Sequence, residues 1–312
     1  MWWLVFPVFG SILYCVGGYS QNYLTDNAIQ RGRAGSYVVL RLIGHIAAII
    51  LLLSIFGRAV FMMPLQNAVG LMLAGAINVI GSAFHCKALQ KGDNADISIF
   101  GQVSPVISLG LGVLILGESI TANQGLGFVC IMGAIMYVIL SNNTRRGGPN
   151  ASVAATTVVS SFFSILSDIV YSYFLFGTAD YTHFAQAFFF FELGSVLITV
   201  LACIFFESWR KAVKKAFFAG PRHKQNLVHA LSENLTFIVA DVLYKLGLML
   251  APVKSLVSVV SRVVNLFSSL FITIFFGRVF PKFISARRPS KKTLMQYGVA
   301  AIFIVVGLVL IN

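Results

Sequence analysis

Residues 141–150, SNNTRRGGPN, form a polar, basic stretch that contains glycine and proline, which is typical of a linker between structured segments. Apolar segments lie on both sides of it, and each is long enough to cross a hydrocarbon core, which takes about 20 residues. The spans predicted before the linker are 2–20, 36–56, 67–87, 96–117 and 122–141, and those predicted after it are 152–176, 183–206, 228–250, 252–276 and 296–311. The sequence therefore predicts an all-α polytopic membrane protein of ten transmembrane helices, with a first repeat over 1–141, a linker over 142–151 and a second repeat over 152–312.

The composition agrees with a membrane location. Of the 312 residues, 58% are hydrophobic and 11% are charged, and the formal net charge is +13. In a soluble protein such a charge would indicate a nucleic-acid partner. Here most Lys and Arg lie in short segments between apolar runs, where anionic lipid headgroups and retention in the cytoplasm explain them better. We therefore expect membrane lipids, and no nucleic acid, as partners.

Motifs for catalysis or metal binding are missing from the sequence. The four cysteines fall inside apolar runs without CxxC spacing, and Ser/His/Asp, P-loop and GxGxxG arrangements are absent. The N-terminal segment lacks a basic region and a small-residue cleavage site, so it is predicted to remain as the first helix. We expect neither an enzyme nor a bound metal or cofactor.

Weak internal similarity relates the two sets of spans. At an offset of about 153 to 160 residues, Ser11-Ile12-Leu13 falls on Ser164-Ile165-Leu166 and Gly117 falls on Gly277. Because each repeat has an odd number of spans, the second must be inserted upside down relative to the first. Inverted repeats of this kind are the plan of many secondary transporters.

The charges of the loops predict the orientation. The loops after odd-numbered spans carry two Lys or Arg in each of the first three and six in each of the last two, eighteen in all. The loops after even-numbered spans carry only Arg58 and Lys254. Because cytoplasmic loops are enriched in Lys and Arg, the odd-numbered loops are predicted to lie in the cytoplasm of a cell-membrane protein, with both termini outside.

A run of short motifs lies near the end of the first repeat. It comprises Ala88-Leu89-Gln90, Gln102-Val103-Ser104-Pro105-Val106, Leu116-Gly117-Glu118-Ser119-Ile120-Thr121 and Gln124-Gly125-Leu126-Gly127. In this pattern a proline lies inside the fourth helix, Gly-Glu ends that helix, and a glycine-containing segment starts the fifth.

These motifs resemble the signature of EamA-type transporters, which belong to the drug/metabolite transporter superfamily. The resemblance implies a ten-helix transporter of metabolites, amino acids or drugs with a central cavity lined from both halves. The second half departs from it, because Gly277-Arg278 stands where a second Gly-Glu is expected and a basic insertion follows. The family also implies cytoplasmic termini, in contrast to the loop charges.

Several acids are predicted to lie deep in the membrane, where an ionisable group is costly and therefore either paired or part of a pathway. Asp168 precedes Asp180 by 12 residues and Glu192 follows it by 12. If Asp180 marks a turn, both acids lie about 13 to 15 Å below it, near mid-membrane. Asp241 is predicted at a similar depth. Each of the three is a candidate for proton coupling or, equally, for a structural pair.

Arg262 is the cation predicted to lie at the same depth, too far from the surface to reach the headgroups. In the repeat alignment it falls close to Gln102. As a guanidinium it is able to bind a carboxylate or phosphate with two parallel hydrogen bonds. Arg262 and Gln102 are therefore predicted to bind substrate, with Tyr14, Tyr171 and Asn265 as further candidates.

Other polar residues have simpler interpretations. Arg41 is predicted to reach lipid headgroups, and His45 to be a satisfied core histidine. Lys245 follows Asp241 by one turn and is predicted to neutralise it. Glu118 is predicted to accept hydrogen bonds from the backbone at the start of the fifth helix.

The sequence thus favours a secondary transporter with alternating access around a midplane cavity, for an amino acid or another organic anion or zwitterion, with proton coupling as an option. One alternative is an exporter of cationic drugs from the same superfamily. The other is a lipid-handling membrane protein that transports nothing. A monomer and a homodimer are both compatible with the sequence.

Overall fold

The computed structural model describes residues 2–27, 35–91, 97, 100–101, 103–143, 151–175, 180–207, 209, 211, 223–279 and separate positions from 295 to 310. Helices and short turns account for these residues, and no strand occurs among them. The all-α class is confirmed.

The described helices follow one another along the chain. They are η1 (Trp2–Leu4), α1 (Val5–Asn27), α2 (Gly35–Phe56), η2 (Gly57–Phe61), α3 (Leu65–Leu89), α5 (Ser104–Leu116), α6 (Ala122–Asn143), α7 (Ala151–Leu175), α8 (Tyr181–Phe205), α10 (His223–Leu250) and α11 (Lys254–Val279).

Most predicted spans match these helices to within a few residues, but the fourth and the first differ. Within the span predicted over 96–117, Ile97, Phe100 and Gly101 are helical, but α5 begins at Ser104, so Pro105 lies in the first turn of α5 rather than in a helix interior. Proline is tolerated there because the first-turn N–H has no partner within the helix. The first span extends to Asn27, seven residues beyond the predicted end. In the tenth predicted span, 296–311, nine of the sixteen residues are described and each is helical, whereas most of the linker lies outside the described residues.

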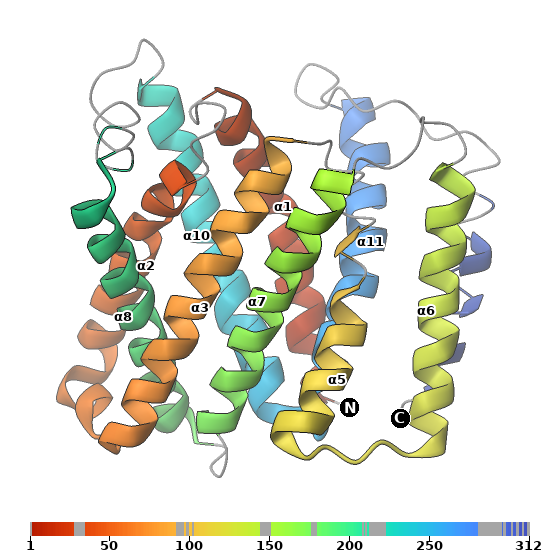
Figure 1. The fold of residues 1–312 in the computed structure, drawn as a ribbon, viewed down its shortest axis with the longest axis horizontal. Coiled ribbons are helices and arrows are strands. Elements are labelled where there is room, and N and C mark those ends of the chain that lie inside the picture. Colours follow the sequence, from red (N-terminus) through yellow and green to blue (C-terminus); the bar gives the residue numbers. More distant parts are fainter. Residues whose placement is uncertain are drawn as a thin grey trace.

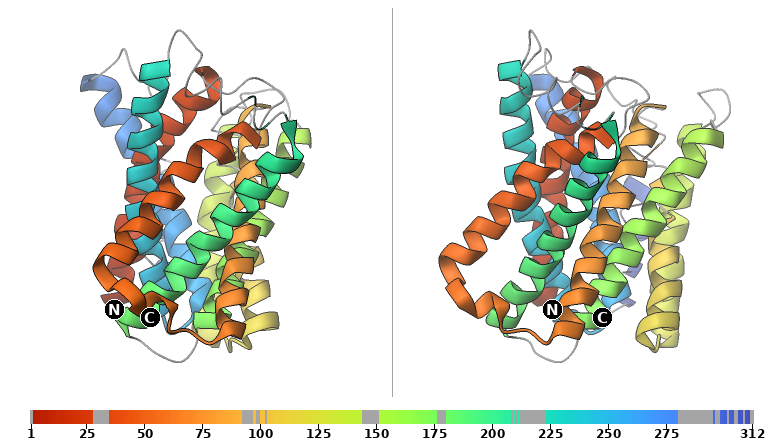
Figure 2. Two further views of the ribbon diagram at one scale, coloured as in Figure 1. Left: turned by 90° about the vertical axis from the view of Figure 1, so that its left-hand side faces the viewer. Right: turned by 60° about the vertical axis from the view of Figure 1, so that its left-hand side comes forward.

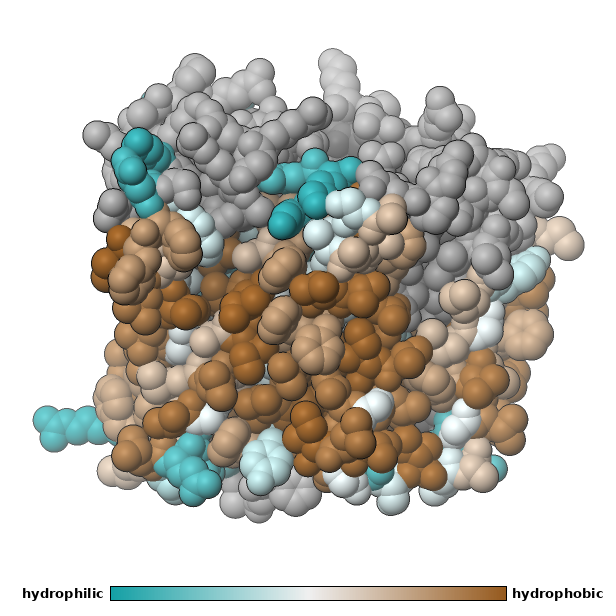
Figure 3. All heavy atoms as spheres, in the orientation of Figure 1, coloured by the Kyte–Doolittle hydropathy of each residue, from teal (hydrophilic) through white to brown (hydrophobic). Residues whose placement is uncertain are grey.

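Five described helices are long and apolar enough to cross a membrane: Tyr37–Phe61, Leu65–Leu89, Ala151–Leu175, Tyr181–Phe205 and Lys224–Leu250. Trp2–Gly18 and Ser104–Leu116 are shorter apolar helices. Apolar side chains form a broad band across the middle of the face seen in Figure 3, with polar ones above and below it. The chain is therefore a multi-pass membrane protein, and the total of ten spans stays a prediction.

The helices stand side by side between two ends of the molecule (Figures 1 and 2). Helix α3 packs against α7 and α8, α1 packs against α10 and α11, and α5 packs against α7 and α11. The ends of α1 and α3 and the starts of α7 and α10 lie at one end of the molecule, whereas η2 and the start of α11 lie at the other (Figure 1).

The turn after α5 connects two parts of the bundle. Gly117 ends α5 in the left-handed conformation, with φ of 66°, which glycine adopts without strain. The carboxylate of Glu118 then accepts hydrogen bonds from the backbone N–H groups of Lys254 and Ser255. Glu118 therefore caps α11, not the fifth predicted helix that follows it in sequence, because the start of α11 packs beside the end of α5.

Helices α3 and α8 cross closely enough to exclude side chains at two glycines. A methyl group on Gly75 would meet the carbonyl oxygen of Phe191, and one on Gly194 would meet Met72 O. Small residues at such crossings let helix backbones approach in a membrane. The α3–α8 crossing therefore depends on glycine at both positions.

We predict that Gly75→Ala will destabilise the protein by about 1–3 kcal/mol, because backbone atoms must move apart to admit the methyl group. Gly133→Ala in α6 is the matched control, since nothing lies within 4 Å of its added methyl group. Thermal unfolding of the purified proteins in detergent measures both. Equal melting temperatures for the two variants would contradict the close crossing.

Candidate functional site

A cavity of about 370 Å³ lies between the helices. Most of the residues that line it have polar side chains, although the helices around it are mostly apolar. It is lined by Tyr14, Cys15, Gln21, Tyr37, Arg41, Asn78, Ser82, His85, Ile97, Gly101, Thr157, Ser160, Ser161, Ser164, Ile165, Asp168, Phe191, Phe237, Asp241, Tyr244, Lys245, Ser258, Ser261, Arg262 and Asn265.

The polar lining follows from helical periodicity. On α7 the lining residues Thr157, Ser161, Ser164 and Asp168 recur at intervals of three and four. Residues with this spacing share one face of an α-helix. The lining residues of α3, α10 and α11 have the same spacing. Each of these helices therefore turns a polar stripe toward a common space.

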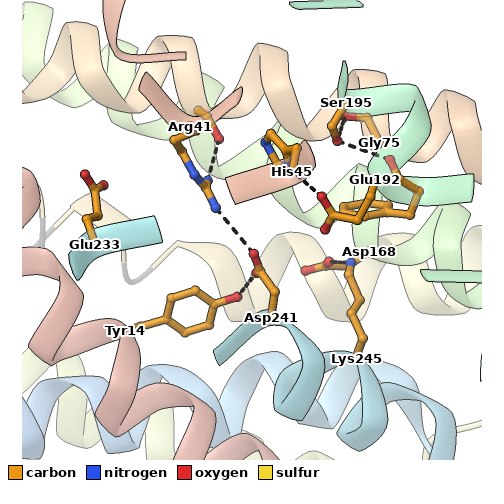
Figure 4. Close-up of polar contacts among 12 residues, drawn as sticks. Tyr14, Arg41, His45, Gly75, Asp168, Glu192, Ser195, Glu233, Asp241 and Lys245 are labelled. Atoms are coloured by element: carbon orange, nitrogen blue, oxygen red, sulfur yellow. Dashed lines mark hydrogen bonds and ion pairs between the residues drawn. The ribbon is translucent and has the colours of Figure 1, made fainter. Parts of the chain in front are cut away.

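Asp241 is held by a cation and a hydroxyl group from two other helices. Arg41 Nη2 lies 3.3 Å from Asp241 Oδ2, and the Tyr14 hydroxyl donates a hydrogen bond to Oδ1 (Figure 4). Arg41 Nη1 also donates to Ser82 Oγ at 3.4 Å. Arg41, Tyr14 and Phe237 enclose this site, since the guanidinium lies 5.1 Å from the Phe237 ring centroid. These contacts join α1, α2, α3 and α10.

Asp168 pairs with Lys245 across α7 and α10. Lys245 Nζ lies 2.5 Å from Asp168 Oδ1, and the lysine side chain is only 3% exposed. The ammonium group also lies 4.5 Å from the ring centroids of Tyr171 and Phe191. An ammonium over aromatic faces is further stabilised by their electron density. Asp168 thus neutralises the ammonium group of Lys245, and the two aromatic rings cover it.

Two further acids lie behind the cavity wall. Glu192 Oε2 is 2.5 Å from His45 Nδ1, and both side chains are buried (Figure 4). Glu233 accepts a hydrogen bond from the Tyr37 hydroxyl and is fully buried. Neither acid lines the cavity.

Arg262 differs from the other lining cations. It lines the cavity from α11, close enough to Asp168 and Tyr244 to interact electrostatically with both. No hydrogen bond or ion pair joins it to any residue that the structure describes. Arg41 and Lys245, by contrast, each bind a carboxylate. Among the described residues, Arg262 is therefore a cavity cation without a bound carboxylate.

The predicted site residues are distributed as follows. Arg262, Tyr14, Asn265, Asp168 and Asp241 all line the cavity. Tyr171 and Glu192 do not line it; Tyr171 lies against Lys245, and Glu192 against His45. Gln102 lies outside the described residues. The roles of these residues in binding and coupling stay predictions.

Two expectations about neighbouring charges are wrong. Lys245 does not neutralise Asp241 on its own helix but Asp168 on α7, and Asp241 binds Arg41 instead. Arg41 does not reach the headgroups, because Asp241 and Ser82 hold it at the cavity. His45 is satisfied, as expected, but its partner is an acid rather than a neutral group.

Glu233 was not among the site residues predicted from the sequence. It precedes Asp241 by eight residues, a spacing that places both on one face of α10. The eight-residue spacing from Asp241 could have identified Glu233 as a candidate from the sequence. No group of three or more His, Cys, Asp or Glu side chains able to hold a metal ion occurs within the described part of the chain.

The chain is similar to known proteins in sequence and in fold. The EamA-like transporter family matches residues 25–140. An uncharacterized protein of Methanocaldococcus jannaschii is 26% identical over 132 residues, which are 42% of this chain and 92% of that protein. A solved protein crystal structure covers 99% of this chain and 96% of its own, with a TM-score of 0.63 and 15% sequence identity. At that identity the likeness shows the fold alone.

We predict strong coupling between Asp168 and Lys245. Lys245→Met leaves a partly buried carboxylate without its cation and should destabilise the protein by up to about 3–5 kcal/mol, the cost of breaking a fully buried pair. Adding Asp168→Asn removes that uncompensated charge and should restore most of the lost stability. Thermal unfolding of the single and double variants measures the coupling, and additive losses would contradict the pairing.

Proposed function

We propose that the chain is a member of the EamA-like transporter family of the drug/metabolite transporter superfamily, whose model matches residues 25–140, and that it is a secondary transporter of an organic anion or zwitterion. In this proposal the substrate occupies the cavity of about 370 Å³, which is within the usual range for small-molecule sites. Alternating access opens the cavity to one side of the membrane at a time.

The observation that carries the choice of substrate is the guanidinium of Arg262, which lines the cavity and makes no hydrogen bond or ion pair with any described residue. Leaving such a group without a partner at membrane depth is costly. A carboxylate or phosphate on the solute would supply two acceptors in the geometry that guanidinium prefers. Asn265, one turn further along α11, lines the same cavity and offers an amide beside it.

Export of a cationic drug is less well supported, because the acids are already occupied. Asp168 binds Lys245, and Asp241 binds Arg41 and Tyr14. A cationic solute would have to displace a resident cation before it met a free carboxylate. The same pairs would be expected in a protein that transports nothing, so the distinction rests on Arg262 and on measured flux.

The inverted-repeat plan forms part of the proposal and is supported by reciprocal packing. Under that plan α1 corresponds to α7, α3 to α10, and α5 to α11. Helix α1 packs on α10 and α11, and α7 packs on α3 and α5, which is the exchange that a two-fold axis in the membrane plane produces. The cavity lies within one chain, so a monomer is sufficient for transport, and a homodimer would contain two such cavities.

Proton coupling would follow from the same ion pairs. Protonation of Asp241 would release Arg41, and protonation of Asp168 would release Lys245. Either event would add a free cation to the cavity beside Arg262. Binding of a proton would thereby favour binding of an anion, which is the linkage that cotransport requires.

We predict that Arg262→Gln will reduce flux by at least about tenfold, because the anion loses a charge-assisted pair of hydrogen bonds. Flux is measured in proteoliposomes with labelled glutamate, leucine, gluconate and glucose 6-phosphate, and with tetraphenylphosphonium as a cation. Arg262→Lys keeps the charge but loses the planar fork and should also transport more slowly.

Arg58→Gln is the matched control, since Arg58 is an exposed arginine in η2 away from the cavity wall. It should leave flux unchanged. Unaltered anion flux in Arg262→Gln would contradict the proposed role. Transport of tetraphenylphosphonium alone would favour the cation exporter, and no flux of any solute would favour the protein that transports nothing.

For orientation, we predict that the loops after odd-numbered spans face the cytoplasm, because they carry most of the Lys and Arg. In a background without the native cysteines, Lys211→Cys should resist an impermeant maleimide in intact cells, whereas Arg58→Cys should react. Both residues are exposed in the structure. The reverse pattern would place the basic loops outside.

A further inference from the structure

Glu233 of α10 is a buried acid that has no cation as a partner among the described residues. Asp168, Glu192 and Asp241, by contrast, each lie against a basic side chain. Glu233 is fully buried, and the Tyr37 hydroxyl donates a hydrogen bond to its Oε1 atom. Its Oε2 atom is buried as well and has no hydrogen-bonding partner in the described part of the chain.

A charged carboxylate would be costly in these surroundings. Tyr37, which binds Glu233, belongs to a buried apolar cluster formed by Leu24, Tyr37, Leu40, Cys86 and Ala230. A buried charge needs an opposite charge or a full set of hydrogen bonds, whereas a neutral carboxylic acid loses far less hydration energy on burial. Because Glu233 has one hydrogen bond and no cation, we expect it to hold a proton in this arrangement.

Arg41 of α2 lies between Glu233 and a second acid, Asp241. Glu233, Phe237 and Asp241 follow one another at intervals of four along α10, so they share one face of the helix. Phe237 is about 6 Å along the helix axis from each acid. The guanidinium carbon of Arg41 lies 5.1 Å from the centroid of the Phe237 ring. The guanidinium is thus close enough to both acids to interact electrostatically with each.

In this structure the guanidinium is bound to Asp241. Arg41 Nη2 lies 3.3 Å from Asp241 Oδ2, and Figure 4 draws an ion pair from Arg41 to Asp241 and none to Glu233. Two acids and one guanidinium are electrically neutral only when the acids share one proton, and neutrality is strongly favoured within a membrane. With the proton on Glu233, Arg41 pairs with Asp241. With the proton on Asp241, Arg41 would pair with Glu233.

We propose that Glu233 is a proton-binding site outside the cavity and that it competes with Asp241 for Arg41. Loss of the Glu233 proton draws Arg41 away from Asp241 and leaves that carboxylate to the Tyr14 hydroxyl. Only a second proton, bound to Asp241 while Glu233 keeps its own, would leave Arg41 free. The face of the Phe237 ring supports the guanidinium between the two acids. The inference holds whichever solute the chain carries.

The Tyr37 hydroxyl connects Glu233 with the cavity. Tyr37 lines the cavity and Glu233 does not, so a proton would reach the acid by way of the hydroxyl that binds it. Two other titratable groups lie near Glu233: Cys86 of α3, and His229 one turn earlier on α10. The described side chains of α1 include no charged group. Of these described neighbours, Arg41 is the one that is always charged.

Infrared spectroscopy tests the proton on Glu233, because a carboxylic acid and a carboxylate absorb at different frequencies. Purified full-length protein in nanodiscs is measured at neutral pH, and the difference spectrum between each variant and the wild type isolates the affected group. Glu233→Gln should lose a carboxylic acid band that the wild type shows. Glu207→Gln is the matched control and should keep that band, since Glu207 is an exposed acid paired with Lys211.

Two further variants test the competition for Arg41. Asp241→Asn releases Arg41, which should then bind Glu233 and abolish the same band although Glu233 is still present. Arg41→Gln removes the cation for which the acids compete, so both acids should be protonated and the band should about double. Tyr37→Phe removes the hydrogen bond to Glu233 and should move the band to higher frequency, which provides the readout if Glu233→Gln does not fold.

A carboxylic acid region that is identical in Glu233→Gln and the wild type would show that Glu233 is ionised and would overturn the inference. An unchanged band in Asp241→Asn would overturn the competition, because Arg41 would not have moved to Glu233. A band in Arg41→Gln no larger than that of the wild type, or a band unmoved by Tyr37→Phe, would also contradict it. The flux of Arg262→Gln is measured independently, so failure of the proton site and failure of the proposed function are recognised separately.

Discussion

A charge placed in hydrocarbon costs several kcal/mol unless an opposite charge or a set of hydrogen bonds neutralises it, and the described helices of this protein are arranged around that constraint. Lys245 of α10 binds Asp168 of α7, Arg41 of α2 binds Asp241 of α10, and His45 of α2 faces Glu192 of α8. Each pair joins two helices that are distant in sequence. Satisfying the charges therefore also fixes which helices are neighbours.

Helix α10 has a central place in this arrangement. It contributes Asp241 and Lys245, which are separated by one turn and bind partners on opposite neighbours. Their mutual attraction along the helix would be worth only a few tenths of a kcal/mol. Partners on other helices, with buried contacts and covering aromatic rings, stabilise these charges more. Pairing between helices therefore prevails over pairing within α10.

The sequence predicted what depends on length and apolar character. The bounds of α2, α3, α7 and α8 follow from the need for about 20 apolar residues. The similar depth of Asp168 and Glu192 could also be predicted from the sequence, because Asp180 immediately precedes α8 and marks the turn from which both depths are counted. The contacts of Lys245 with Asp168 of α7 and with Phe191, next to Glu192 on α8, agree with that shared depth.

The partners of the charges could not be predicted in the same way. Arg41 lies near a helix end in sequence, and only the packing of α2 on α10 shows that Asp241 is within its reach. Glu118 was expected to cap a helix start, which it does, but the helix is α11, which begins 136 residues later. Spacing along one helix carries no information about the register between helices, and that register decides the pairs.

The distribution of pairs has a consequence for movement. The two ion pairs and the His45–Glu192 contact connect α2, α7, α8 and α10, whereas α11 is joined to its described neighbours by neutral contacts such as Ser11–Ser261 at 2.7 Å and by the Glu118 cap from α5. Arg262 lines the cavity from α11, and Thr157, Ser161 and Ser164 line it from α7. A solute that contacted both helices would connect α11, which has no ion pair among the described residues, to the group of helices that the ion pairs join. Because a ligand shifts a conformational equilibrium only through a difference in affinity between two states, a solute that bridges α7 and α11 is suited to drive alternating access, whereas one bound to α11 alone is not.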